Sequence, residues 1–431
     1  MLRSMQTAIG ALGLEQTAMD NISNNIANVN TQGYKSSRAN FQDLLSQTLS
    51  YGAQPTATRG GLDPTQIGLG VRLGGISRSF SQGSLLATGR NLDLAIQGDG
   101  FFVYQDPNTT ANRFYSRDGQ LEMDSQGYLV NIATGYRVLG WTADTLGNVD
   151  TGQAINGLKL PLNQTKARAT SQATLSGNLD TNLPVYAAPP STTPPNYYDS
   201  TISLYDGLGV LQNVTVRFTK ASVVTPAPLP PGVAATWNWN VTTAGATGAG
   251  TVTFDSSGKY ILNTVATPIV VPGSNGAQAI TLSTNTTFDL TNLTQLSSSG
   301  NVALANQNGL AAAAVQNFIV DQNNGDIYAV YGNGLQDRFG RMALSTFTNP
   351  EGLAQLGKNM YTVSLNSGAG AIGWPGNGGK GTLAVGYNEG SNVDLGREFT
   401  SMILAQRGFQ AASRMITTSD EMLQELVNLK R

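Results

Sequence analysis

Apolar positions near the N-terminus recur three and four residues apart, with Gln16 between two groups. They are Leu2, Met5, Ile9, Leu12, Met19, Ile22, Ile26 and Val29. This spacing predicts a helix with one apolar stripe, close to a coiled-coil seam. Gly10 and Gly13 each weaken that helix by roughly 1 kcal/mol relative to Ala. We expect the helix to stop near Asn30, with Gly33 as a left-handed residue after its end.

The last 40 residues repeat the arrangement on a longer helix. Its seam positions are Leu395, Phe399, Met402, Phe409, Ile416, Leu423 and Val427, and the stripe is widened by Ile403, Met415, Met422, Leu426 and Leu429. Ser391 or Asn392 can cap its start, with Asp394 near the positive helix end. About 35 residues at 1.5 Å each span roughly 50 Å. An isolated helix cannot bury its own stripe, so the two helices need each other or other copies of the chain.

Everything between the two helices is typical of β-structure. Residues 114–141, "FYSRDGQLEMDSQGYLVNIATGYRVLGW", place Gly-containing turns between short alternating strands. Residues 201–221, "TISLYDGLGVLQNVTVRFTKA", predict a hairpin. Residues 51–70 have no periodicity and predict an extended connection. The expected fold is therefore mainly β with long terminal α-helices, in which terminal helices flank a β region that itself flanks a central β insertion.

Composition narrows the chemistry. Charged residues make up only 12% of the chain and the net charge is −2, without any basic block, so bulk electrostatic binding to nucleic acid is not expected. The chain has no Cys and no His, which excludes disulfides, thiolate sites and His-based catalysis. No apolar run reaches the roughly 18–20 residues of a membrane span. The N-terminus lacks the pattern of a cleaved signal peptide.

Three candidate chemical sites give way to simpler interpretations. "DQNNGDIY" (321–328) resembles a calcium loop through Asp321, Asn323 and Asp326, but its Gly is at the fifth position and Gly332 stands where Glu belongs. A tight turn is the better interpretation. "GLGVRLGG" (68–75) imitates a dinucleotide loop without a following helix. Turn chemistry explains the remaining acidic candidates better than paired-carboxylate catalysis; these are Asp99, Asp118 and Asp124. We expect no enzyme activity, no catalytic residue, no metal and no cofactor.

Several long motifs, in a fixed order, resemble the bacterial flagellar axial proteins, the family of hook and rod subunits. "NNIANVNTQGYK" is similar to the N-terminal signature, and "NLDLAIQGDGFFVY" with "YSRDGQLEMDSQGYLV" to the first β-domain. "LSTFTNPEGLAQLGKNMYTVSLNSG" (344–367) resembles that domain's return segment, and residues 389–431 resemble the C-terminal helix. A long insertion between the halves of the first β-domain favours a hook subunit over a distal rod subunit.

The resemblance implies a nested, discontinuous division of the chain. Residues 1–30 with 393–431 would form a terminal helical coiled-coil layer, and 31–72 an extended connector. Residues 73–149 with 316–392 would form the first β-domain, and 150–315 an inserted outer β-domain. Gly33, Tyr34 and Lys35 would act as the hinge between helix and connector; the simpler alternative is a helix cap followed by an exposed polar residue.

The resemblance also implies a function. The chain would be a structural subunit of the flagellar hook, assembling with many copies of itself through the two helix seams into a flexible tube. That tube would transmit motor torque as a universal joint and enclose the export channel. Expected partners are the rod, the hook cap, the hook–filament junction and the export apparatus, with no nucleic acid and no membrane insertion. The chain would be exported without a cleaved signal and be extracellular. The alternatives are a distal rod subunit and a secreted β-rich adhesin or surface-layer protein.

Overall fold

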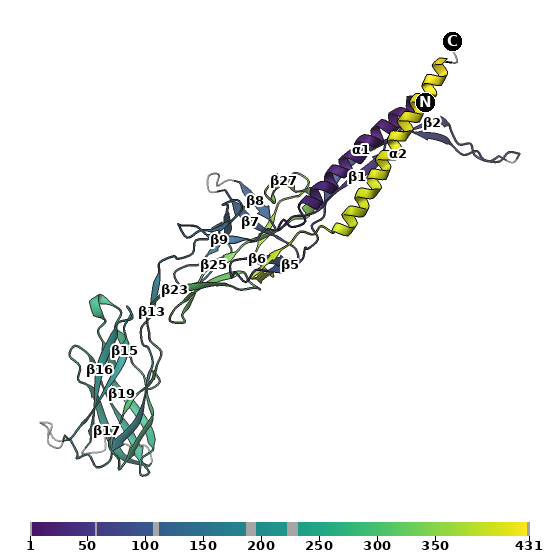
Figure 1. The fold of residues 1–431 in the computed structure, drawn as a ribbon. Helices are drawn as coiled ribbons and strands as arrows, with labels where there is room; N and C mark the ends of the chain where they lie inside the picture. Colours follow the sequence, from purple (N-terminus) through teal and green to yellow (C-terminus); the bar gives the residue numbers. More distant parts are fainter. Residues whose placement is uncertain (1, 57, 107–111, 187–194, 222–231, 429–431) are drawn as a thin grey trace. The chain divides into compact units, whose positions relative to one another are not determined.

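The computed structural model describes residues 2–56, 58–106, 112–186, 195–221 and 232–428. The chain divides into two compact units (Figure 1). The first unit comprises residues 1–160, 318–329 and 337–431, and the second unit comprises residues 161–317 and 330–336. The predicted fold class, mainly β with long terminal helices, is confirmed.

The N-terminal helix α1 (Leu2–Ala27) ends slightly earlier than expected. The backbone N–H of Asn28 still donates to Asn24 and Asn25, and turns follow to Asn30. Gly33 adopts a φ of +68°, so the predicted left-handed residue is confirmed. Such a conformation suits Gly because any other residue would place its Cβ against the backbone.

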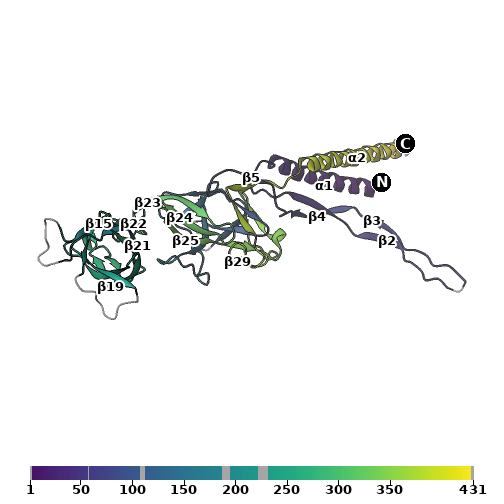
Figure 2. The same ribbon diagram turned by 90° about the horizontal axis from the view of Figure 1, so that it is seen from below.

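The C-terminal helix α2 (Leu395–Asn428) runs antiparallel to α1, and both views show the two side by side (Figures 1 and 2). Its N-cap is Asp394, whose Oδ1 accepts from the backbone N–H of Gly396 at 2.9 Å and of Arg397 at 3.2 Å. The sequence-based assignment of Ser391 or Asn392 as the cap was therefore wrong. A carboxylate satisfies two free N–H groups and also complements the positive helix end.

A ribbon of two antiparallel strand pairs follows α1. β1 (Ser37–Asp43) pairs with β4 (Val71–Arg78), and β2 (Ser46–Ser50) pairs with β3 (Thr65–Gly68). The segment 51–70, predicted as an extended connection, contains the regular strand β3. α1 packs against β1 and β4, whereas large apolar side chains of the ribbon are 45–57% exposed, among them Leu49, Ile67 and Ile76. Because few of its side chains are buried, the ribbon has little of the alternation that burial of one face imposes.

The β-body of the first unit is built from short strands that bring together segments far apart in sequence. An antiparallel series runs in the order β24-β25-β11-β7-β8-β28-β27. The strands are β5 (Leu85–Ala87), β6 (Leu94–Gln97), β7 (Phe101–Gln105), β8 (Arg113–Ser116), β9 (Leu121–Met123), β10 (Leu129–Asn131), β11 (Arg137–Thr142), β12 (Asn156–Gly157), β24 (Asp326–Tyr331), β25 (Gln336–Met342), β26 (Leu344–Thr346), β27 (Ala354–Gly357), β28 (Met360–Thr362), β29 (Ala371–Gly373), β30 (Thr382–Val385) and β31 (Tyr387–Glu389). Two buried apolar clusters, one around Phe102 and Leu344 and one around Phe101 and Tyr361, form its core.

The second unit holds one apolar core between two sheets. A six-stranded antiparallel sheet has the order β15-β16-β17-β18-β19-β20, and a three-stranded sheet has the order β21-β14-β22. Its strands are β13 (Thr165–Arg168), β14 (Ala173–Asp180), β15 (Tyr198–Tyr205), β16 (Leu211–Lys220), β17 (Val233–Val241), β18 (Thr247–Asp255), β19 (Tyr260–Val271), β20 (Ile280–Leu282), β21 (Phe288–Leu296), β22 (Ala303–Gln307) and most of β23 (Leu310–Val320). The predicted hairpin over 201–221 is confirmed as β15 and β16. Trp239 packs on Phe288 across the core, with ring centroids 4.9 Å apart.

Candidate assembly site

Small side chains form the most deeply buried part of the contact between α1 and α2. Ala405, Ala412 and Ser419 are buried and lie seven residues apart on α2, and Ala8 is buried on α1. Small residues let two helix backbones approach closely. Sequence analysis missed these four positions because it followed only the large apolar residues. Their heptad spacing was the signal that could have found them.

The predicted seam residues divide into two groups. One group is half-buried along the contact: Met5, Leu12, Met19, Ile22 and Ile26 on α1, Val29 just after it, and Met402, Phe409, Ile416 and Leu423 on α2. A second group stays exposed, with relative exposures of 40–67%: Ile9, Leu395, Phe399 and Val427. Leu2 lies in α1 and Leu426 in α2, but their side chains are outside the described part of the structure. The whole of Leu429 is outside it as well.

An acidic side chain lies in the contact between the two helices. Glu15 on α1 lies against Gly408 on α2, where an added Cβ would come within 2.5 Å of the carboxylate oxygen Oε1. Burial raises the pKa of the Glu15 carboxyl. Gly408 therefore makes room for an acidic side chain at the contact, and a larger residue there would require the Glu15 carboxylate to move.

The outer face of α2 carries large apolar side chains that the chain itself leaves in solvent. Phe399 is 51%, Ile403 57%, Leu404 67%, Met415 51% and Met422 50% exposed. Large exposed apolar patches on soluble proteins mark interaction sites. The face formed by these five residues is therefore the strongest candidate for contact with another protein surface.

The predicted hinge is a buried ionic cluster. Lys35 and Glu389 have fully buried side chains, and Lys35 Nζ lies 2.5 Å from Glu389 Oε1. Arg117, also buried, approaches the other oxygen of Glu389 at 3.5 Å. Lys35 Nζ also donates to the carbonyl of Ser81 at 2.7 Å, and the backbone N–H of Gly83 donates to Glu389 at 2.9 Å.

This cluster corrects the simpler interpretation of the hinge, in which Lys35 is exposed. Burial lowers the pKa of the Lys35 ammonium, and Glu389 opposes that shift. Burial likewise lowers the pKa of Arg117. A buried carboxylate with two cationic partners requires all three groups in place, because an unpaired buried charge is strongly unfavourable. No local sequence signal links Lys35 to Glu389, since 354 residues separate them.

Asn25 connects four segments at the same end of the helix pair. Its Oδ1 accepts from the Tyr34 hydroxyl at 3.1 Å and from the backbone N–H of Ser37 at 3.0 Å. Its Nδ2 donates to the Ser37 carbonyl at 2.8 Å and to Glu398 Oε1 at 3.3 Å. One amide therefore links α1, the hinge, the start of the β1–β4 ribbon and α2. The buried Asn of the N-terminal signature is satisfied within its own chain.

Two further residues fix the hinge to the β-body. The backbone N–H of Gly33 donates to the carbonyl of Glu389 at 2.8 Å, and an added Cβ on Gly33 would lie 2.9 Å from Asp118 N. Asn392 Oδ1 accepts from the backbone N–H of Ser36 at 2.7 Å. Its Nδ2 donates to the carbonyl of Ser79 at 2.9 Å. The hinge is thus a packed and hydrogen-bonded joint within the first unit.

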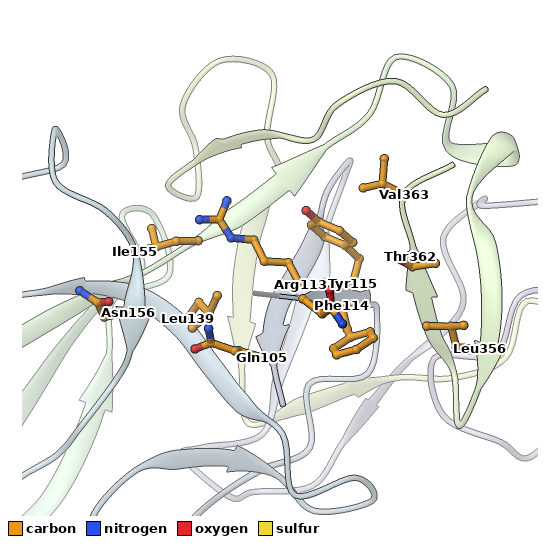
Figure 3. Close-up of a pocket in the computed structure, with 11 residues that line it drawn as sticks. Gln105, Arg113, Phe114, Tyr115, Leu139, Ile155, Asn156, Leu356, Thr362 and Val363 are labelled. Carbon is orange, nitrogen blue, oxygen red and sulfur yellow. The ribbon is translucent and has the colours of Figure 1, made fainter. Parts of the chain in front are cut away.

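A cavity of about 770 Å³ in the first unit offers no catalytic group (Figure 3). Arg113 and Tyr115, both from β8, lie in the middle of its lining. Leu139 and Ile155 lie on one side of them, and Thr362 lies on the other side. Among the described residues that line the cavity, only Arg113 and Tyr115 are titratable, and burial raises the pKa of Tyr115. Neither is suited to act as a general base near neutral pH.

The acidic candidates take part in turns and ion pairs. Asp321 Oδ1 accepts from the backbone N–H of Asn323 at 2.8 Å, so the predicted tight turn is confirmed. Asp326 is buried and pairs with Arg341 at 2.6 Å. Asp124 Oδ1 accepts from the backbone N–H of Gln126 and Tyr128.

Asp118 is also held by hydrogen bonds, from the backbone N–H of Gln120 and from the Asn131 side chain. Within the described part of the chain, no group of three or more acidic residues is arranged to hold a metal. No described helix has the length and apolarity to cross a membrane.

Four protein families match successive parts of the chain. Residues 5–35 match "Flagella basal body rod protein", and residues 95–174 match "Flagellar hook protein FlgE/F/G D1 domain". Residues 174–310 match "Flagellar basal body protein FlaE D2 domain". Residues 384–429 match "Flagellar basal body rod FlgEFG protein C-terminal". The first and last matches cover α1 with the hinge and α2 with Glu389.

Full-length relatives agree with these matches. The chain is 36% identical to the flagellar hook protein FlgE of Borreliella burgdorferi, over 100% of both chains. It is 32% identical to FlgE of Salmonella typhimurium, over 99% of this chain and 100% of that protein. It is also 32% identical to the flagellar basal-body rod protein FlgG of Bacillus subtilis, over 100% of both. The chain therefore belongs to the flagellar hook protein family.

Proposed function

We propose that the chain is the structural subunit of the bacterial flagellar hook and assembles with many copies of itself into a flexible tube. The observation that carries this proposal is the face of α2 formed by Phe399, Ile403, Leu404, Met415 and Met422, which the chain leaves exposed. A subunit that buries such a face only against other copies gains most of its helix stability on assembly. Heterologous contacts that do not close into a ring extend such an assembly into a helical tube.

The buried joint gives this function a mechanical basis. Torque passing from the helices to the β-body crosses the hinge, where Lys35, Arg117 and Glu389 form the ionic cluster. Because those charges cannot separate without leaving one unpaired in the interior, the joint resists rotation. Bending of the tube is then expected to come from contacts between subunits outside this joint.

The direct test is negative-stain microscopy of concentrated protein. Curved tubes are the expected result, because a universal joint must bend while it turns. Straight tubes would favour the second candidate function, a distal rod subunit. The similarity to the rod protein of Bacillus subtilis is the observation that supports this second candidate. A protein that stays monomeric at all concentrations would contradict both assignments.

We further propose that the second unit makes adjustable contacts between subunits. The whole chain has few charged residues, 12%, so few strong ion pairs are available to fix one register between neighbours. Tubes lacking residues 162–316 should then show a changed curvature. Unchanged bending after this deletion would contradict an adjustable role for the second unit.

The wider partners follow from a place in the hook. The rod at one end, the hook cap during growth and the hook–filament junction at the other end are expected to contact the tube. Export through the flagellar export apparatus without a cleaved signal would deliver the subunit to its extracellular position. Retention of Met1 or its simple removal in hooks purified from cells, measured by mass spectrometry, is the expected result; a shortened N-terminus would contradict this route.

A further inference from the structure

Charges of opposite sign are separated along the exposed side of α2. Arg407 and Arg414 lie in the middle of the helix, and Glu421 and Glu425 lie near its C-terminal end. All four side chains are exposed. Among the ion pairs formed by described residues, none includes any of these four. The chain therefore presents a basic segment and an acidic segment whose charges it does not pair itself.

The four residues share one side of the helix. Arg407, Arg414 and Glu421 are seven residues apart, and Glu425 follows one turn later. Ala405 and Ala412, which face α1, each precede one of the Arg residues by two positions. At 100° per residue, two positions correspond to about 200° around the helix. The charged side therefore points away from α1.

Pairing within α2 cannot compensate for this arrangement. Arg414 and Glu421 are seven residues apart, about 10 Å along the axis, which is beyond the i,i+4 distance at which helical ion pairs form. Glu421 and Glu425 are like charges at i,i+4, which is unfavourable. Glu425 also lies in the last turn, where the helix dipole favours cations. The acidic segment is thus placed where the isolated helix gains least from it.

The complementary charges are available on a second copy of the same helix. In α1 the charged residues are Arg3, Glu15 and Asp20, which supply one cation against two acids. We propose that the acidic segment of α2, Glu421 and Glu425, contacts the basic segment, Arg407 and Arg414, of α2 in a neighbouring copy. This inference rests on the proposed self-assembly and adds the register between neighbours.

The charge pattern selects an axial offset between parallel copies. Without an offset, Arg would face Arg and Glu would face Glu. An offset of seven residues would pair Glu421 with Arg414 but would also place Arg414 beside Arg407. An offset of 14 residues places Glu421 beside Arg407, and one of 11 residues places Glu425 beside Arg414. At 1.5 Å per residue these offsets are about 16–21 Å. Each copy then offers its acidic segment to one neighbour and its basic segment to another, which is an open-ended contact.

Charge reversal of each segment tests the contact. One variant carries Arg407→Glu and Arg414→Glu, and a second carries Glu421→Arg and Glu425→Arg. Each variant alone should raise the critical concentration for assembly at least about tenfold, because like charges then face each other across the interface. An equimolar mixture of the two should assemble near the wild-type concentration, as should a single chain carrying all four substitutions, since both arrangements restore opposite charges. Pelleting and microscopy measure the assembled fraction.

The controls separate this contact from other causes. Arg90→Glu with Lys259→Glu changes the net charge by the same amount as the first variant, at exposed positions outside the helices, and should leave assembly unchanged. Unchanged assembly by either single-segment variant would overturn the proposal, and so would failure of both the mixture and the fourfold variant. The proposal would also be overturned if assembly of the first variant were restored only by a second chain or substitution pair carrying Glu15→Arg with Asp20→Arg. That result would make α1, and not α2, the partner of the basic segment. If the wild-type chain itself does not assemble, the proposed function fails instead.

Discussion

The second unit and the pair of terminal helices bury their apolar side chains in opposite ways. In the second unit, Trp237, Phe254 and Phe288 are fully buried within one core. On α2, Ile403 and Leu404 are 57% and 67% exposed, while the contact with α1 is made by Ala405 and Ala412. The second unit completes its core alone. The helices bury small residues deeply, keep some large apolar residues half-buried along their contact, and leave others exposed for another surface.

This difference separates two sources of stability. A closed core gives a unit that should unfold cooperatively whatever its concentration. A helix pair joined by small residues gains less apolar burial per residue, so its stability is expected to depend on assembly. The ionic cluster between these helices and the β-body is stabilised in a third way. It requires that every buried charge in the cluster has an oppositely charged partner.

The largest expected effect comes from polar substitution of the exposed helix face. Ile403→Asp with Leu404→Asp should abolish tube formation, since two carboxylates would be desolvated at the contact. The thermal unfolding of the second unit should not change. Leu208→Asp is the matched control, because Leu208 is 51% exposed in the second unit. Microscopy and calorimetry measure the two outcomes, and normal tubes from the helix variant would contradict the account.

Next in size is the loss of the central carboxylate of the joint. Glu389→Ala leaves Lys35 and Arg117 buried without their shared partner, and should destabilise the first unit by about 3–5 kcal/mol. The exposed ion pair between Arg217 and Asp199 in the second unit is the contrast, since its side chains are 25% and 34% exposed. Asp199→Ala should cost about 1 kcal/mol or less. Denaturant unfolding of both variants measures the difference, and equal effects would show that the joint is not a special element.

Acid should act on the second unit through Asp206. Burial acts to raise the pKa of this carboxyl, but hydrogen bonds from Ser274, Val210 and Gln212 outweigh it and hold the pKa well below its usual range. A group with a lowered folded pKa stabilises the protein above its unfolded pKa of about 3.9, and that stability is lost as the pH falls below this value. Asp206→Asn should cost about 1.5–3 kcal/mol at neutral pH.

The pH dependence provides the check on Asp206. Below about pH 4 the stability of the wild type should fall toward that of Asp206→Asn, because the unfolded chain binds the proton before the folded carboxylate does. The two stabilities should meet only as the pH falls through the lowered folded pKa. Urea unfolding of the second unit at several pH values measures both curves. A difference between the two proteins that stays constant down to the lowest pH would contradict this role.

The smallest expected effect is overpacking of the helix contact. Ala412→Leu inserts three extra carbons at a buried position between α1 and α2 and should cost about 1–3 kcal/mol. Ala411→Leu adds the same side chain at the neighbouring exposed position and should lower the thermal stability of the helices in the assembled tube less. Circular dichroism of the assembled tube on heating distinguishes the two variants. Equal helical stability in both variants would mean that the small-residue contact does not join the helices.

Sequence analysis succeeded where a local pattern records the structure. The two helices, the turn at Gly33 and the hairpin formed by β15 and β16 all follow from residue spacing or turn chemistry. It did not identify the strand pairing of the β1–β4 ribbon, few of whose side chains are buried. It also placed the cap of α2 two or three residues too early, because Asn392 bonds to Ser36 instead of to the helix.

The candidate site was less accessible to sequence analysis than the fold. Lys35 could be named from its place after α1, but its burial depends on Glu389 and Arg117, which lie far away in the sequence. The helix seam was sought among large residues, whereas the closest contacts use Ala405, Ala412 and Ser419. Long-range ion pairs leave no local trace in one sequence, whereas the small residues of the helix contact leave one in their seven-residue spacing.

The central claim is that other copies of the chain complete the exposed face of the terminal helices. Hydrogen exchange of verified monomer and assembled tube, compared peptide by peptide, tests it most directly. The account predicts fast exchange over residues 1–30 and 393–431 in the monomer, strong protection of both in the tube, and equal protection of the second unit's core strands in both states. Strong protection of the helices in the monomer, with no further gain on assembly, would contradict it.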